Sequence, residues 1–223
     1  MATIKIVDVI SQAETIIQDK TNTRWPKQEW LDWFNGAVLA VIGLRPDANI
    51  ANEAFTLTAN TALQSIPAEG LKLINVLFNA TSGRQIRRID KRMLDDQVDN
   101  WYAATGNDVD HYVYDDRDPK TFWVYPSMTA AHDVQIIYSK APAAIVVADF
   151  GTDVQVLPID DSYMNPILDF MLYRAYSKDS DYAQNAQRAE SHLRAFQLAL
   201  GAKTESDAGI SASNSRKGVV ANG

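Results

Sequence analysis

The chain has 223 residues, a formal net charge of −7 and a sequence pI of about 4.9. It contains no cysteine, which excludes disulfides, thiol catalysis and thiolate metal sites. The acidic balance argues against a general nucleic-acid binder, and no apolar run approaches the roughly 20 residues of a membrane-spanning helix. The first residues lead directly into an amphipathic pattern rather than a signal peptide, so we expect a soluble protein made inside a cell, with no membrane partner.

The first part of the chain, residues 1–50, carries two helical patterns. Apolar residues recur at three- and four-residue steps along residues 4–19, which places them on one stripe of a helix. A second helix is predicted to begin near Pro26, because its fixed φ suits a first helical turn, and to end near Gly43. We therefore predict an N-terminal helical hairpin over residues 1–50.

The middle region, residues 51–157, changes to the two-residue period of strands. Short β-rich runs separated by turns predict an antiparallel sheet or a small sandwich. The expected strands are 55–58, 63–67, 73–78, 85–90, 112–114, 121–125 and 134–138, with a short helix at 91–98 and edge strands at 145–148 and 154–157. The strand at 85–90 is expected to pair with 73–78 across a turn at Ser82 and Gly83.

The helical period returns in residues 158–203. A first run at 167–176 has capping residues at 160–162, and a polar hinge separates it from a second run at 182–200. Gly201 suits the end of that second helix. Two hairpins, each with an apolar stripe left to bury, pack most simply on each other. The predicted fold class is therefore α+β: a bundle of two helical hairpins from the chain ends, an inserted antiparallel β-rich region and an extended C-terminal arm.

The last segment, residues 204–223, is rich in small and polar residues. A segment with so little apolar surface is expected to be disordered when alone. We therefore predict a flexible arm that another chain holds in place. The residues expected to make this contact are Ile210, Arg216, Lys217, Val219 and Val220.

A basic cluster interrupts the acidic chain. It comprises Arg84, Arg87, Arg88, Lys91 and Arg92. Contact with an acidic neighbouring subunit, contact with DNA phosphates, and a solvated strand edge that resists aggregation all explain such a cluster. We favour subunit contact or solvent over DNA, and predict Arg84, Arg87 and Arg88 as interface residues.

Three further patterns have both a functional and a structural explanation. The aspartates between Asp108 and Asp118 suggest calcium, but their spacing is not that of an EF-hand, and turn chemistry explains them. The aromatic residues of the middle region suggest a sugar platform, although strand core and interface are the usual explanation for such residues. His192 could be a metal ligand, but no second ligand follows at helical spacing, so a surface or core histidine is the better explanation. No phosphate loop, nucleophile elbow or zinc-protease motif occurs, so we expect neither an enzyme nor a cofactor or metal.

Several local strings, together with the order of elements, resemble a known family. The strings are Trp-Leu-Asp-Trp-Phe-Asn at 30–35, Leu-Arg-Pro at 44–46, Phe-Thr-Leu at 55–57, Leu-Gln-Ser-Ile-Pro at 63–67, Arg-Met-Leu-Asp at 92–95 with Trp101, Pro-Lys-Thr-Phe-Trp-Val-Tyr-Pro at 119–126, and Leu-Tyr-Arg-Ala-Tyr-Ser-Lys-Asp at 172–179. Up to about residue 203, the chain is similar to the head-to-tail adaptor, or connector, proteins of short-tailed double-stranded DNA bacteriophages.

This resemblance implies a non-enzymatic virion protein at the head-tail junction, made in the host cytoplasm. Copies of such adaptors form a dodecameric ring that joins the portal protein to the tail nozzle protein. DNA passes through the ring without sequence-specific binding, and an acidic lumen suits this because it repels phosphates. The alternatives are another tail component, such as a tube or stopper protein, and, from a different class, a small ligand-binding module or hydrolase.

Overall fold

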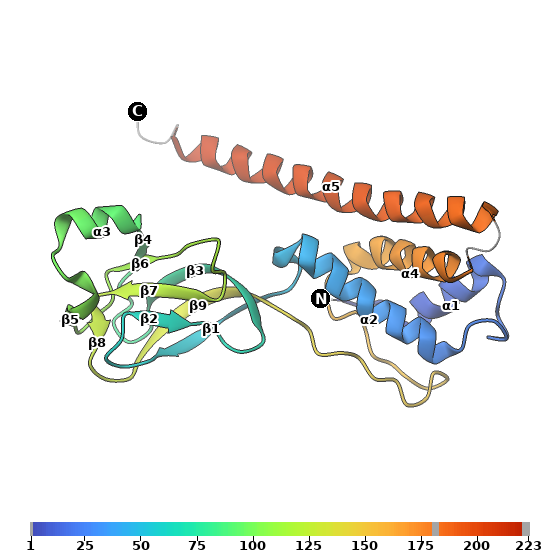
Figure 1. Ribbon diagram of the computed structural model, residues 1–223, viewed down its shortest axis with the longest axis horizontal. Coiled ribbons are helices and arrows are strands. Elements are labelled where there is room, and N and C mark those ends of the chain that lie inside the picture. Colours follow the sequence, from blue (N-terminus) through green and yellow to red (C-terminus); the bar gives the residue numbers. More distant parts are fainter. Residues whose placement is uncertain (1, 180–182, 220–223) are drawn as a thin grey trace. The chain divides into compact units, whose positions relative to one another are not determined.

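The computed structural model describes residues 2–179 and 183–219 (Figure 1). The chain divides into two compact units. The helical unit comprises Met1–Arg45 and Ala143–Gly223, and the β unit comprises Pro46–Pro142. The β unit is thus an insertion between two parts of the helical unit, and the fold is mixed α+β.

The helical unit is organised around one helix, α4. Its helices are α1 (Ile6–Ile17), α2 (Lys27–Leu44), α4 (Met164–Lys178), which follows a 3₁₀ turn at Asp161–Tyr163, and α5 (Ala183–Val219). The apolar face of α4 contacts α1, α2 and α5. α1 and α2 contact each other less than either contacts α4, so the main partner of each N-terminal helix lies at the other end of the chain.

The apolar stripes expected from the sequence form the core of this unit. Ile6 and Ile10 of α1 are fully buried, as are Trp30 and Phe34 of α2. Trp30 packs edge-on against Trp33, with ring centroids 5.0 Å apart. Full burial of one large apolar side chain contributes roughly 1.5–3 kcal/mol relative to leaving it in water. Burial of these side chains therefore stabilises a unit that has no disulfide.

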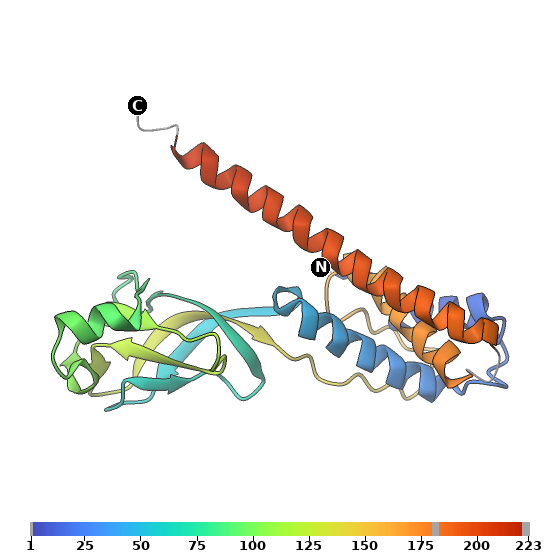
Figure 2. The ribbon, with the colours of Figure 1, turned by 45° about the horizontal axis from the view of Figure 1, so that its top comes forward.

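α5 runs back along α4 and extends well beyond the N-terminal end of α4, as two views show (Figures 1 and 2). The sequence analysis placed its end at Gly201, followed by an extended arm, and this expectation is corrected because the helix continues to Val219. A glycine in a helix interior costs only about 1 kcal/mol relative to alanine, and residues 202–219 contain no proline to break the helix. The role of this segment as a binding arm stays a prediction.

A long loop, residues 143–160, leads back to α4 from the β unit. Its end pairs with the start of the chain, because the Ile6 N–H donates to the Gln155 carbonyl at 3.0 Å and the Leu157 N–H donates to the Ile4 carbonyl at 3.0 Å. The edge strands expected at 145–148 and 154–157 do not form; a single β-bridge between Lys5 and Val156 is present instead.

The β unit contains three small sheets. The first sheet has three strands in the order β1 (Ile50–Leu57), β9 (His132–Lys140), β3 (Gly70–Asn79). The second has four strands in the order β2 (Leu63–Ser65), β7 (Thr121–Tyr125), β6 (His111–Val113), β4 (Arg87–Arg88). The third consists of β5 (Thr105–Gly106) paired with β8 (Ser127–Met128). The unit also contains α3 (Lys91–Gln97) and 3₁₀ turns at Pro46–Ala48 and Trp101–Ala103. One cluster of buried side chains joins the first two sheets, with Ile136 from one and Phe122 from the other.

The strand after the turn at Gly83 pairs differently from the expectation. Only a bridge from Phe78 to Gln85 remains of the predicted hairpin, and β4 instead runs parallel to β6. The buried side chain of Asn79 accounts for this change. Its Nδ2 donates to the Val109 carbonyl at 2.8 Å, and its Oδ1 accepts from the Val109 N–H at 2.8 Å. These bonds hold the start of β6 beside the turn, so β4 meets β6.

Candidate protein-interaction surface

The basic cluster lies on the β unit, where β4 leads into α3. Arg87 and Arg88 form β4, and Lys91 is the first residue of α3. The Asp90 side chain caps α3 by accepting a hydrogen bond from the Arg92 N–H at 2.9 Å. Strand pairing therefore fixes one end of this stretch and a helix N-cap fixes the other, while the side chains of all five cations of the cluster stay exposed.

A groove of about 830 Å³ runs beside the cluster, and we call it the basic groove. Its lining combines apolar, cationic and acidic side chains: Arg88, Ile89, Asp90, Lys91, Arg92, Val113, Tyr114, Asp115, Asp116, Arg117 and Trp123. Ile89 and Trp123 are only partly buried and therefore present apolar surface to the groove. Apolar surface among charged groups suits a protein partner, since it offers both desolvated contact and charge-assisted hydrogen bonds.

A smaller hollow of about 410 Å³ adjoins β4 on the other side of the cluster. It is lined by Arg84, Gln85, Arg87, Asp110 and His111. The Arg84 guanidinium lies 2.8 Å from the Asp110 carboxylate. Arg87 has no acidic partner in the described part of the chain. The three predicted interface residues of this region thus lie on one stretch but line two different hollows.

The cations of the cluster differ in how far they are already paired. The Arg88 guanidinium donates to the Tyr114 carbonyl at 3.1 Å and lies over the Tyr114 ring, 5.3 Å from its centroid. Lys91 pairs with Asp95 at 2.8 Å. Among residues 2–179 and 184–203, whose side chains the structure describes, neither Arg87 nor Arg92 has an ion-pair partner. These two guanidinium groups are the ones left to bind an external carboxylate.

Hydrogen bonds hold two groups of the basic groove, Asp115 and Lys91, in their charged forms. Side-chain hydrogen bonds from Arg117, aided by its backbone N–H, lower the pKa of Asp115 to about 2. The side-chain hydrogen bond to Asp95, followed by one to Tyr102, raises the pKa of Lys91. Both shifts favour the charged forms, so titration near neutral pH does not change the charge of these groups.

The aspartates that suggested calcium are engaged in turns and pairs. Asp108 accepts from the Ser82 hydroxyl at 2.9 Å, and Asp118 accepts from the Thr121 hydroxyl at 2.6 Å. Within the described residues, no three His, Asp or Glu side chains are grouped so that they could hold a metal ion. The structure therefore supports the turn explanation for these two aspartates.

The aromatic residues of the middle region mostly lie in the core. Trp101, Tyr112 and Phe122 are buried, and the Trp101 indole donates to the Asp95 carboxylate at 2.8 Å. Trp123 differs because it is only partly buried and lines the basic groove. Tyr114, although buried, also lines this groove, so the structure places two aromatic side chains of this set in the candidate surface rather than a sugar-binding row.

His192 acts in helix packing. Its Nδ1 lies 2.9 Å from the Asp169 carboxylate of α4, and its ring stacks on Tyr176 with centroids 5.7 Å apart. The partner carboxylate lies 23 positions away on another helix. Helical spacing within one run could not reveal such a pair.

Sequence reasoning also missed one wall of the basic groove. Tyr114, Arg117 and Trp123 come from β7 and the turn before it, and the pairing of β4 with β6 brings them beside the basic cluster. No sequence signal connects them, because the expected pairing of β4 was with a different strand. Of the remaining predicted contacts, Ile210, Arg216, Lys217 and Val219 lie in the last part of α5, but their side chains fall outside the described part of the chain. Val220 falls outside it altogether.

The comparisons with known proteins place the whole chain in one family. The model of the SU10 adaptor protein family matches residues 4–217, which include nearly all of both units. No curated protein matches the chain. Across the described residues, no helix combines the length and apolarity that crossing a membrane requires. The chain therefore belongs to the SU10 adaptor protein family and is a structural adaptor protein of a bacteriophage, a virion component that binds other phage structural proteins.

Proposed function

We propose that the protein is the head-to-tail adaptor of a short-tailed phage, forming a ring that joins the portal to the tail nozzle. The observation that carries this proposal is the family match over residues 4–217, because it includes the helical unit, the β unit and most of α5. An adaptor between two assemblies needs separate surfaces for separate partners. In the proposal, the basic groove on the β unit and the part of α5 beyond α4 serve as two such surfaces.

In this proposal the end of α5 and the residues after it bind the portal or a neighbouring adaptor copy. Ile210, Val219 and Val220 supply the apolar contacts, while Arg216 and Lys217 pair with acidic groups. Fixing this segment on a partner costs conformational entropy, which the contacts must offset. Repetition around a ring makes weak single contacts strong together, because every further arm binds at a high effective concentration.

The acidic chain suits a conduit for DNA. A net charge of −7 on each copy gives a ring a strongly negative potential, and phosphates that meet it are repelled rather than held. DNA then passes through the lumen without sequence-specific binding. In the proposal, Arg84, Arg87 and Arg88 contact protein and not DNA.

Reconstitution with purified portal rings and nozzle protein tests the proposal. The expected result is co-sedimentation with portal rings and, in electron micrographs of the complex, a rotationally symmetric layer that recruits the nozzle. Binding to tail tubes but not to portal rings would instead identify a tube or stopper protein. Failure to bind any of these assemblies would overturn the structural proposal and favour the ligand-binding module or hydrolase.

Truncation after Lys203 tests the role of the C-terminal segment. The contact of Lys203 with the Tyr163 ring, 5.0 Å from its centroid, is retained in the shortened chain. Because residues 204–219 are helical, circular dichroism should report a loss of helix limited to that segment. Melting should be unchanged and attachment to portal rings lost. Attachment at full strength would remove the arm from the proposal.

A further inference from the structure

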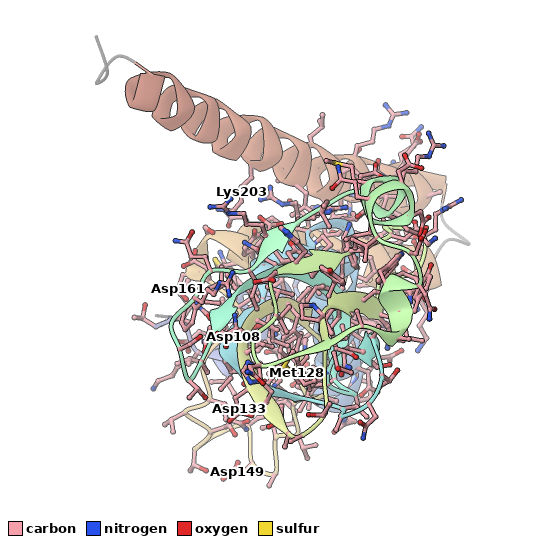
Figure 3. The ribbon with its side chains drawn as sticks, turned by 90° about the vertical axis from the view of Figure 1, so that its left-hand side faces the viewer. Asp108, Met128, Asp133, Asp149, Asp161 and Lys203 are labelled. Atoms are coloured by element: carbon pink, nitrogen blue, oxygen red, sulfur yellow. The ribbon has the colours of Figure 1, made fainter. Side chains whose placement is uncertain are left out.

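The loop of residues 146–156 in the helical unit presents apolar and acidic groups to the outside. Val146 and Val154 are 77% and 68% exposed and therefore present apolar surface to solvent. Asp149 and Asp153 have no cationic partner in the described part of the chain. Asp149 lies at the outer end of the loop (Figure 3). We call this segment the acidic loop.

The acidic loop is held in a defined shape by hydrogen bonds within it. The Asp149 carboxylate accepts from the Gly151 N–H at 2.8 Å, and the Asp153 carboxylate accepts from the Gln155 N–H at 2.8 Å. The Gln155 side-chain amide then donates to the Val146 carbonyl at 3.0 Å across the loop. A loop that is ordered before binding loses little entropy when a partner captures it.

The basic groove offers the chemistry that this loop lacks. Arg92 in its wall has no ion-pair partner among the described residues, and Arg87 beside it is likewise unpaired. The partly buried side chains of Ile89 and Trp123 provide apolar surface within reach of the same occupant. Each carboxylate of the acidic loop retains acceptor positions for a guanidinium, and the exposed valines match the apolar lining.

We propose that the acidic loop of one copy docks into the basic groove of the next copy. This inference rests on the proposed ring, for which it names the surfaces that join neighbours. Because loop and groove are different surfaces of one chain, the contact is heterologous and runs head to tail. A pair of copies joined by one such contact leaves one loop and one groove free, and closure into a ring fills every site.

The absence of cysteine makes the contact directly testable by engineered disulfides. Val154→Cys and Arg92→Cys are prepared as separate full-length variants, mixed and oxidised under assembly conditions. The mixture should give a covalent dimer that neither variant gives alone. The variant that carries both changes should give a ladder of covalent multimers. The matched control pairs Arg92→Cys with Leu198→Cys, whose side chain is equally outward-facing at 73% exposure, and should give no product.

Three results would overturn the inference. Normal rings without a cross-link in the mixture would show that the loop and groove do not meet. A cross-link confined to monomers of the double variant would place the loop in the groove of its own chain. The third result concerns the double variant Arg87→Glu with Arg92→Glu, which should lower the affinity between copies at least tenfold. If this variant forms unchanged rings that fail to bind the nozzle protein, the groove binds the nozzle protein and not a neighbouring copy. If unmodified protein forms no ring with portal, the proposed function itself fails, and this outcome is distinct from the other three.

Discussion

Asn35 of α2 holds the main chain of Ile145 with both ends of its side-chain amide. Its Nδ2 donates to the Ile145 carbonyl at 3.0 Å, and its Oδ1 accepts from the Ile145 N–H at 2.9 Å. The amide thereby takes the place of a neighbouring strand. This pair explains why an extended segment that the sequence marked as an edge strand lies along a helix instead of joining a sheet.

Asn35→Ala should lower the free energy of unfolding by about 1–3 kcal/mol, because two partly buried backbone groups lose their partner. Gln28→Ala on the same helix is the matched control: its amide donates to Asp32 on an exposed face, and its loss should stay within about 0.5 kcal/mol. Denaturant melts measure both. Equal melting of the two variants would show that water replaces the Asn35 amide at no cost.

Phe196→Ala should cost about 3–5 kcal/mol, as large-to-small changes of buried aromatic residues do. The side chain is 3% exposed and packs against Phe170 of α4, with ring centroids 5.2 Å apart. Leu198→Ala, two positions along α5 at 73% exposure, should be nearly neutral. Thermal unfolding followed by circular dichroism separates the two; a neutral Phe196→Ala would contradict the α4–α5 core.

Asp161 ties the start of the chain to the turn before α4, and this contact should be lost in acid. Hydrogen bonds from the Thr3 hydroxyl, at 2.7 Å, and from the backbone N–H groups of Thr3 and Ile4 lower the pKa of Asp161. A lowered pKa means that the contribution to stability is complete above the unfolded value of about 3.9 and fades as pH falls through the folded value.

The difference in melting temperature between the wild type and Asp161→Asn should therefore be constant from pH 7 to about 5 and shrink below about 4. Asp96→Asn, which removes an exposed carboxylate with no hydrogen-bond partner in the described part of the chain, serves as the control and should melt close to the wild type at pH 7. A difference in melting temperature that persists to pH 2 would mean that the shape of the Asp161 side chain, rather than its charge, stabilises the fold.

Arg87→Glu with Arg88→Glu should impair assembly while leaving the fold intact, because both side chains are exposed. Lys120→Glu makes the same kind of charge change elsewhere on the β unit and should leave assembly normal. Assembly of the wild type should also weaken with salt, since the screening length falls from about 10 Å at 0.1 M to about 3 Å at 1 M. Light scattering follows both effects. Normal assembly with impaired DNA passage would favour the DNA explanation.

The sequence was sufficient to predict those helices and strands in which the local pattern of apolar residues agrees with burial in the fold. The stripe that includes Ile6 and Ile10 forms the buried face of α1, and the β-rich run at 121–125 is β7. It was insufficient where one side chain redirects the main chain. Asn79 binds Val109, thirty residues away, and so changes the partner of β4.

The candidate surface, too, could be predicted from the sequence only in part. The basic cluster was visible in the sequence because its residues are consecutive or nearly so. The other wall of the basic groove was not, since Arg117 and Trp123 approach only through the pairing of β4 with β6. The end of α5 was misplaced because one glycine is a weak stop signal, about 1 kcal/mol, that neighbouring residues can outweigh.

The chain enters and leaves the β unit at the same place. The Lys140 N–H donates to the Asn49 carbonyl at 2.9 Å, the Asn49 side chain donates to the Lys140 carbonyl at 2.7 Å, and Ile50 pairs with Ser139. Because the two ends of the insertion lie next to each other, recombination can exchange the whole insertion without moving the ends of the helices that it interrupts. One helical scaffold can therefore carry different β modules.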